Sequence, residues 1–172
     1  ALSKEQHISI VNPTTIYGEG DYTLNSGTLV RLIAKNPVIP VPPGGGNVID
    51  VGDAADGILA AGLRGKSGER YLIGAYNYPF MSTYKAVAKA AGKKPLFVPI
   101  PKAFKLPFAA AAWFAGKILC SRLITPEVIK GMFAYKYFSC AKAERELGWK
   151  AQIPFEESLA AAWKFYREKG LI

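Results

Sequence analysis

The chain has 172 residues, half of them hydrophobic, and carries a formal net charge of +9. This composition allows a buried core and excludes an intrinsically disordered chain, and the scattered basic residues exclude a recognisable nucleic-acid reader. One histidine and two distant cysteines support neither a disulfide framework nor a zinc site, and no secretory leader is visible, which predicts a reducing, cytoplasmic setting.

The first predicted element is a strand that leads into a polar segment. The stretch HISIVN predicts a buried strand of a parallel sheet over 7–11. We expect Pro13 to end it, because proline cannot donate to a neighbouring strand. Asn12 would then lie at the carboxyl end, where open α/β sheets bind ligands. Hydroxyl side chains follow at Thr14, Thr15 and Tyr17. From spacing alone, a ligand site and an ordinary strand-to-loop transition are equally supported.

Proline and glycine separate the next two predicted elements. The apolar spacing predicts a short helix over 28–34 and a strand over 48–51. Between them, the stretch 42–46 predicts a loop or hairpin turn. Its three glycines do not predict a phosphate-binding loop, because such a loop precedes a helix, whereas these glycines precede another strand.

Two carboxylates begin the following helix. Asp53 is placed to cap it, Asp56 lies at the capping-box position, and Ile58, Leu59 and Leu63 form an apolar face. Capping is favoured over a catalytic pair, because both carboxylates lie where the helix dipole stabilises negative charge.

Further elements alternate between extended and helical segments. The sequence predicts a strand over 70–73, a helix from Ser82 to Gly92 and a short extended stretch over 96–101. The most apolar segment, Phe104–Leu123, predicts a helix that is too short in its uncharged run to span a membrane. Packing within the protein is favoured for it, and peripheral contact with a membrane surface is the alternative.

Three predicted helices complete the chain, over 126–133, 142–147 and 155–169. The last carries Leu159, Trp163 and Tyr166 on one face. We expect Trp149 and Trp163 to be largely buried where these helices pack against the body.

Four segments, taken in order, resemble one family. The extended short-chain dehydrogenase/reductases, also called NAD-dependent epimerase/dehydratases, contain stretches similar to VNPTTIYGEGD, NVIDVGDAADGILAA, GERYLIGAYNYPFMSTYKAVAKAAGK and AKAERELGWKAQIPFEESLAAAWKFYREKG. The resemblance is nearest to the branch of dihydroflavonol reductases, hydroxysteroid dehydrogenases and sugar epimerases. It covers the C-terminal half of the family only, because the GxxGxxG fingerprint of the Rossmann domain is not in this sequence.

The resemblance implies roles for several residues. In the family, the segment after the first strand lines the nicotinamide and the substrate, which makes four residues candidates for cofactor binding: Asn12, Pro13, Thr14 and Thr15. Tyr17 becomes a candidate for substrate binding. The lysine of the family's catalytic YxxxK pair would be Lys4, with the tyrosine immediately before Ala1. Only two residues separate Lys4 from the strand at His7, whereas a crossover takes about a dozen residues, so a surface lysine is an equal alternative.

We therefore expect an α/β fold that comprises the C-terminal part of a Rossmann-type parallel sheet and a smaller, mostly helical substrate-binding region. Residues 1–75 would hold the end of the Rossmann-type domain with interleaved substrate-region segments, and residues 76–172 the helical region.

The resemblance implies part of an NAD- or NADP-dependent oxidoreductase or epimerase, inactive as this chain alone. The whole enzyme would transfer hydride to or from a carbinol or carbonyl of a sugar nucleotide, a flavonoid or a steroid-like molecule, as a monomer or a homo-oligomer. The alternative is a non-catalytic relative that serves as a scaffold or a membrane-associated subunit.

Overall fold

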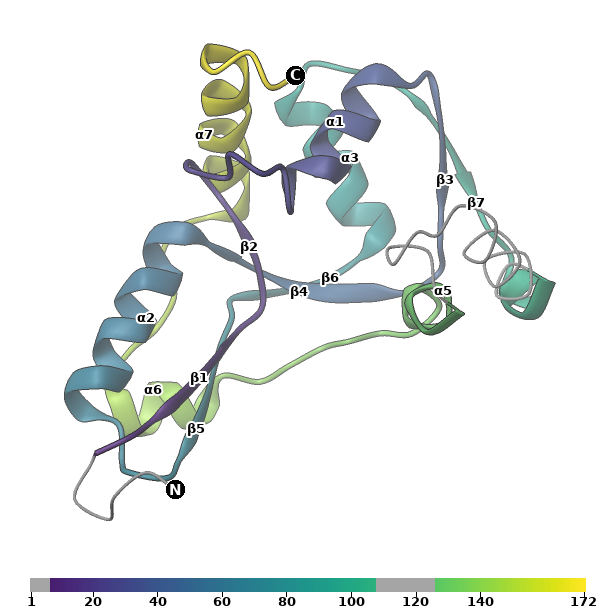
Figure 1. The fold of residues 1–172 in the computed structure, drawn as a ribbon. Coiled ribbons are helices and arrows are strands. Elements are labelled where there is room, and N and C mark those ends of the chain that lie inside the picture. Colours follow the sequence, from purple (N-terminus) through teal and green to yellow (C-terminus); the bar gives the residue numbers. More distant parts are fainter. Residues whose placement is uncertain (1–6, 108–125) are drawn as a thin grey trace.

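A computed structural model describes residues 7–107 and 126–172 and shows an α/β fold with parallel strands (Figure 1). Three small sheets form it. In the first, β1 (Ile10–Pro13) pairs in parallel with β5 (Arg70–Ile73). In the second, β4 (Gly45–Asp50) lies between parallel β2 (Thr15–Tyr17) and antiparallel β6 (Tyr76–Pro79). In the third, β3 (Val38–Val41) pairs in parallel with β7 (Leu96–Pro99).

Most of the longer helices lie in two groups at the two ends of the molecule, whereas α5 (Pro126–Met132) lies apart from both (Figure 1). The described helices are α1 (Gly27–Lys35), α2 (Val51–Arg64), α3 (Phe80–Ala90), the 3-10 turn η1 (Lys102–Phe104), α5, α6 (Ala141–Leu147) and α7 (Phe155–Glu168). Figure 1 shows α2 and α6 beside β1 and β5, whereas α1, α3 and α7 lie at the other end, with β4 and β6 between the two groups.

Each end has its own hydrophobic core. The α2 and α6 end buries Tyr71 and Leu147, and the α1, α3 and α7 end buries Ile39 and Tyr166. Both cores combine segments from before and after residue 75. A domain boundary at that position stays a prediction. Most predicted elements are confirmed, among them the strand over 70–73 and the last three helices.

The first strand differs from its prediction over 7–11, because it begins at Ile10 and continues through Pro13 instead of ending before it. The Ile10 N–H donates to the carbonyl directly before β5, and the Thr14 N–H donates to the carbonyl of the last residue of β5, each at 2.9 Å. Alternate residues of a strand face the same neighbour, so the missing N–H of Pro13 points away from β5 and costs no hydrogen bond. The strand is also less buried than expected: Ile10 is 38% exposed, because β5 is its one neighbouring strand in the described part of the chain.

The start of α2 also corrects the sequence interpretation. Asp50 caps the helix by accepting a hydrogen bond from the Gly52 N–H at 2.6 Å. Asp53 is instead buried, with 4% of its surface exposed, and accepts hydrogen bonds from the backbone N–H groups of Gln152 and Ile153 at 2.9–3.1 Å. It therefore joins α2 to the segment before α7, a contact that spans about a hundred residues of sequence.

The apolar face of α2 is the outer one. Ile58, Leu59 and Leu63 are 48–71% exposed, and the small residues at 54, 57, 60 and 61 face the sheet. A Cβ at Gly57 would lie 2.6 Å from a methyl carbon of Ile73, so the helix packs too closely on β5 for larger side chains.

Asp21 connects α1 to the C-terminal helix. Its carboxylate accepts hydrogen bonds from the N–H groups of Asn25 and Gly27 at 2.8 and 2.9 Å and from the Tyr166 hydroxyl at 3.1 Å. Burial raises the pKa of Asp21, but these hydrogen bonds outweigh the effect and hold the pKa below its ordinary value. The segment around Asp21 is thus a structural junction.

The predicted burial of tryptophans holds for one of two. Trp149 is 6% exposed in the α2 and α6 core, whereas Trp163 is only partly buried on α7. Residues 108–123 of the predicted apolar helix lie outside the described residues. In the part that is described, no helix has the length and apolar character needed to cross a membrane.

Candidate functional site

A cavity of about 470 Å³ opens where the chain passes from β1 to β2. One wall is the junction itself, with Pro13, Thr14 and Thr15. A second wall comes from the first residues of β4, and apolar side chains of later segments complete the lining: Phe80, Met132 and Phe138. Because the cavity lies at the carboxyl end of the parallel strand β1, it occupies the edge where α/β sheets bind ligands.

A chain of amide hydrogen bonds supports this cavity. Asn47 of β4 is 2% exposed, and its carbonyl oxygen accepts hydrogen bonds from the Thr14 hydroxyl at 2.8 Å and the Ala75 N–H at 3.1 Å. Its amide nitrogen donates to Asn77 Oδ1 at 2.8 Å. Asn77 then bonds both backbone groups of Phe138, at 2.9 and 3.0 Å. The relay fixes the end of β1 and the Phe138 segment relative to β4.

Glycine is required at the centre of this arrangement. A Cβ at Gly74 would lie 2.2 Å from Asn47 Oδ1 and 2.8 Å from Thr14 Cγ2. Burial raises the pKa of the nearby Cys140 thiol, and the backbone N–H of Gly74 only partly opposes this, so Cys140 stays protonated near neutral pH.

The structure brings three predicted residues together in the cavity: Pro13, Thr14 and Thr15. Asn12 is exposed and does not line it. Tyr17 is 4% exposed, and its ring packs edge-on against Phe155 with the centroids 5.3 Å apart, in the core. Burial also raises the pKa of Tyr17. A contact of Tyr17 with a substrate remains a prediction. Lys4 lies outside the described residues.

Sequence reasoning missed the hydrogen-bond chain that runs from Thr14 through Asn47 and Asn77 to Phe138. It also missed the cavity wall at Gly45 and Gly46. The stretch 42–46 was expected to be a loop, but β4 begins at Gly45. The usable signal was Asn47 itself, because an asparagine directly before the apolar run of a strand must satisfy its amide inside the fold.

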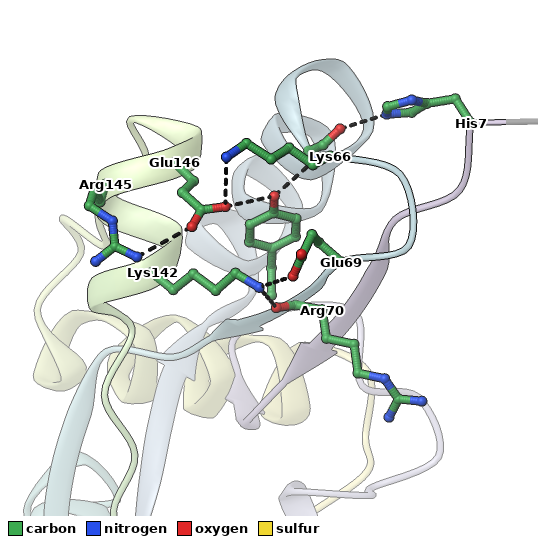
Figure 2. A network of polar contacts seen from close by, with 9 residues as sticks. His7, Lys66, Glu69, Arg70, Lys142, Arg145 and Glu146 are labelled. Atoms are coloured by element: carbon green, nitrogen blue, oxygen red, sulfur yellow. Dashed lines mark hydrogen bonds and ion pairs between the residues drawn. The ribbon is translucent and has the colours of Figure 1, made fainter.

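A second polar network lies at the opposite end of β5 (Figure 2). The hydroxyl of buried Tyr71 accepts a hydrogen bond from the Lys66 N–H at 3.0 Å and donates to Glu146 at 3.2 Å. Beside it, Lys142 forms an ion pair with Glu69. These contacts fasten α6 to the start of β5, and none of these residues lines the cavity.

The described lining of the cavity consists mainly of groups that can bind and orient a ligand. It offers hydroxyl, amide and backbone groups and one ammonium, but no carboxylate, histidine or tyrosine. The described residues also contain no cluster of His, Cys, Asp or Glu that could hold a metal ion. Apart from this ammonium, an acid or base for chemistry on a bound ligand would have to come from outside the described lining.

Comparisons with known proteins find similarity to reductases and epimerases, although no family model matches the chain. A Synechocystis protein named "Putative dihydroflavonol 4-reductase" is 28% identical over 187 aligned residues, which cover 100% of this chain and 52% of the relative. The solved structure of gox2253 has a TM-score of 0.76 and 29% identity, with 94% of this chain and 49% of that one covered.

Two further solved structures share the fold. A nucleoside-diphosphate-sugar epimerase from Pseudomonas aeruginosa has a TM-score of 0.73 and 24% identity over 96% of this chain and 50% of that one. A UDP-glucose 4-epimerase from Bifidobacterium longum, solved with NAD+ and UDP, has a TM-score of 0.65 and 21% identity over 95% and 48%. The chain thus spans about half the length of these relatives.

Proposed function

Because this chain is a homologue of the NAD-dependent epimerase/dehydratases, the extended short-chain dehydrogenase/reductases, we propose that it forms the substrate-side part of an NAD(P)-dependent oxidoreductase or epimerase. The observation that carries the proposal is the cavity beside Thr14, at the carboxyl end of β1. Both the nicotinamide end of a cofactor and a small-molecule substrate would meet there.

The residues present fit one end of such a cofactor. Pro13, Thr14 and Thr15 offer a backbone edge and hydroxyl groups to a carboxamide ring, and the relay through Asn47 keeps that edge in place. The sequence has no GxxGxxG loop for a pyrophosphate. When bound, NAD(P) supplies or accepts the hydride. The role of this chain is to orient the substrate and to exclude water around it.

The substrate of the whole enzyme is proposed to be a carbinol or carbonyl compound. Lys4 is proposed as the lysine that lowers the pKa of a catalytic tyrosine supplied from outside this chain. Taken alone, the chain should therefore neither bind the dinucleotide measurably nor turn over.

Two measurements test the proposal. Titration calorimetry of the 172-residue chain with NADH and NADPH should show no binding, and micromolar binding would contradict it. The complete gene product should oxidise NADH or NADPH with carbonyl substrates. In that product Thr14→Val should lower kcat/KM, because the hydroxyl that Asn47 orients is lost, whereas Thr28→Val on the exposed surface of α1 should leave it unchanged. A complete product with no dinucleotide binding would favour the scaffold alternative.

A further inference from the structure

The three glycines at 44–46 allow another segment to lie directly on β4. The Gly45 N–H donates to the Ala134 carbonyl at 3.1 Å, and the Lys136 N–H donates to the Gly45 carbonyl at 2.9 Å. A Cβ at Gly44 would lie 2.4 Å from the carbonyl oxygens of both Met132 and Ala134. The glycine run therefore serves close packing, and this packing carries Lys136 to the edge of the cavity.

Lys136 supplies the one charged group of the described cavity lining. It forms no ion pair with any described residue, and its ammonium lies beside Gly131, where an added Cβ would come within 2.9 Å of Nζ. That position is near the C-terminal end of α5, which favours a cation. The ammonium is thus held at the cavity and remains available to an anion.

The space in front of this ammonium is apolar and open. Phe80, Met132 and Phe138 line it, and a Cβ built at Gly46 would meet only the Phe80 ring, at 3.8 Å. A larger side chain at position 46 would occupy the cavity, so the glycine leaves room for a ligand. The volume of about 470 Å³ lies within the usual range for small-molecule sites.

We propose that this cavity recognises an amphiphilic anion, with an apolar body against Phe80, Met132 and Phe138 and a phosphate or carboxylate at Lys136. The proposal rests on the proposed function in taking the cavity as the substrate site, and it makes Lys136 a specificity-determining residue. A cavity of this kind would favour substrates that are mostly hydrocarbon over substrates that are polar throughout.

The test measures ligand binding to the 172-residue chain at constant ionic strength. The readout is the NMR chemical shift change of the Gly45 and Gly46 amides. The probes are hexyl phosphate, hexanoate, inorganic phosphate, UDP and 1-hexanol. The better of the two hexyl anions should bind roughly tenfold more tightly than inorganic phosphate, UDP or hexanol, because both the chain and the charge contribute. The ranking of hexyl phosphate against hexanoate identifies the anionic group.

Three variants complete the experiment. Lys136→Gln should weaken binding of the hexyl anion by about fivefold, the range of an exposed ion pair. Lys130→Gln removes the same charge from an exposed position on α5 that does not line the cavity, and should have no effect. Gly46→Leu should abolish binding while the unfolding midpoint shows that the chain is folded.

Equal affinity of wild type and Lys136→Gln would overturn the role of Lys136. Equal or tighter binding of UDP or hexanol, or no binding of either hexyl anion at millimolar concentration, would overturn the amphiphilic anion. The assay contains no dinucleotide, so its result is independent of hydride transfer by the complete gene product. Failure of that transfer together with binding here would reject the proposed enzyme and leave the anion site intact.

Discussion

Replacement of Asp53 tests how α2 is joined to the C-terminal segment. The carboxylate is buried and receives hydrogen bonds from the N–H groups of Gln152 and Ile153 at both of its oxygens. Asp53→Ala would leave both donors without this partner. A buried unpaired N–H costs about 1–3 kcal/mol, and exposed Gln152 can bond water instead, so the expected loss of unfolding free energy is about 2–4 kcal/mol.

Asp53→Asn should cost less, about 1–2 kcal/mol, because the amide keeps one acceptor oxygen and turns an NH2 group toward the same donors. Asp56→Asn is the matched control. It removes an equal charge from the next turn of the same helix. Because Asp56 is exposed, the change in unfolding free energy should stay within about 0.5 kcal/mol.

Urea unfolding measures these free energies, and hydrogen exchange locates the effect. The Gln152 and Ile153 amides should lose protection in Asp53→Asn and keep it in Asp56→Asn. If both asparagine variants had the same stability and the same exchange pattern, Asp53 would be acting only through charge at the helix start, as the sequence had indicated, and the junction with the later segment would be rejected.

The remaining predictions concern packing, the cavity and pH. Trp149→Ala should lower the unfolding free energy by about 3–5 kcal/mol and Trp163→Ala by about 1–2 kcal/mol, because only the first ring is fully buried; equal losses in urea unfolding would contradict this. Gly74→Ala should destabilise the chain by about 2–4 kcal/mol, because the new methyl overlaps Asn47; a loss well below this range in thermal unfolding would contradict the overlap. The lowered pKa of Asp21 stabilises the fold above the ordinary value of 3.8, and this stability is lost as the pH falls through the folded-state pKa; Asp21→Asn should flatten that acidic limb of the stability curve.

The sequence predicted most elements because their local signals agree with the final packing. Arg70–Ile73 combines β-favouring residues with flanking turn signals, and the structure has a strand at the same bounds. Gly92, expected to close the helix that begins near Ser82, has a φ of +64°, which glycine adopts without strain. Such features depend on neighbours in the sequence, so they can be read without knowing the fold.

The burial of α2 could not be predicted in the same way. The periodicity shows an apolar face with Ile58, Leu59 and Leu63, and a second face of glycine and alanine residues, but it does not say which one meets the sheet. The deciding factor is distance, since Gly57 lies against Ile73 and Trp149 with no room for a Cβ. A close helix-to-sheet contact selects small side chains, and the larger ones are left outside.

Of the candidate site, only the wall at the junction of β1 and β2 was predictable from the sequence. Thr14 follows a strand directly, so the rule that ligands bind at the carboxyl end of parallel strands identifies it. Asn47 and Phe138 come from segments that are distant in sequence, and their roles exist only through the hydrogen bonds that join them. A buried asparagine in a strand is costly unless its amide is satisfied at both ends. In this fold Thr14 at the cavity donates to the oxygen of Asn47, and Asn77 accepts from its NH2 group. Because Asn77 also bonds Phe138, the buried Asn47 amide aligns the hydroxyl of Thr14 with the segment that carries Lys136.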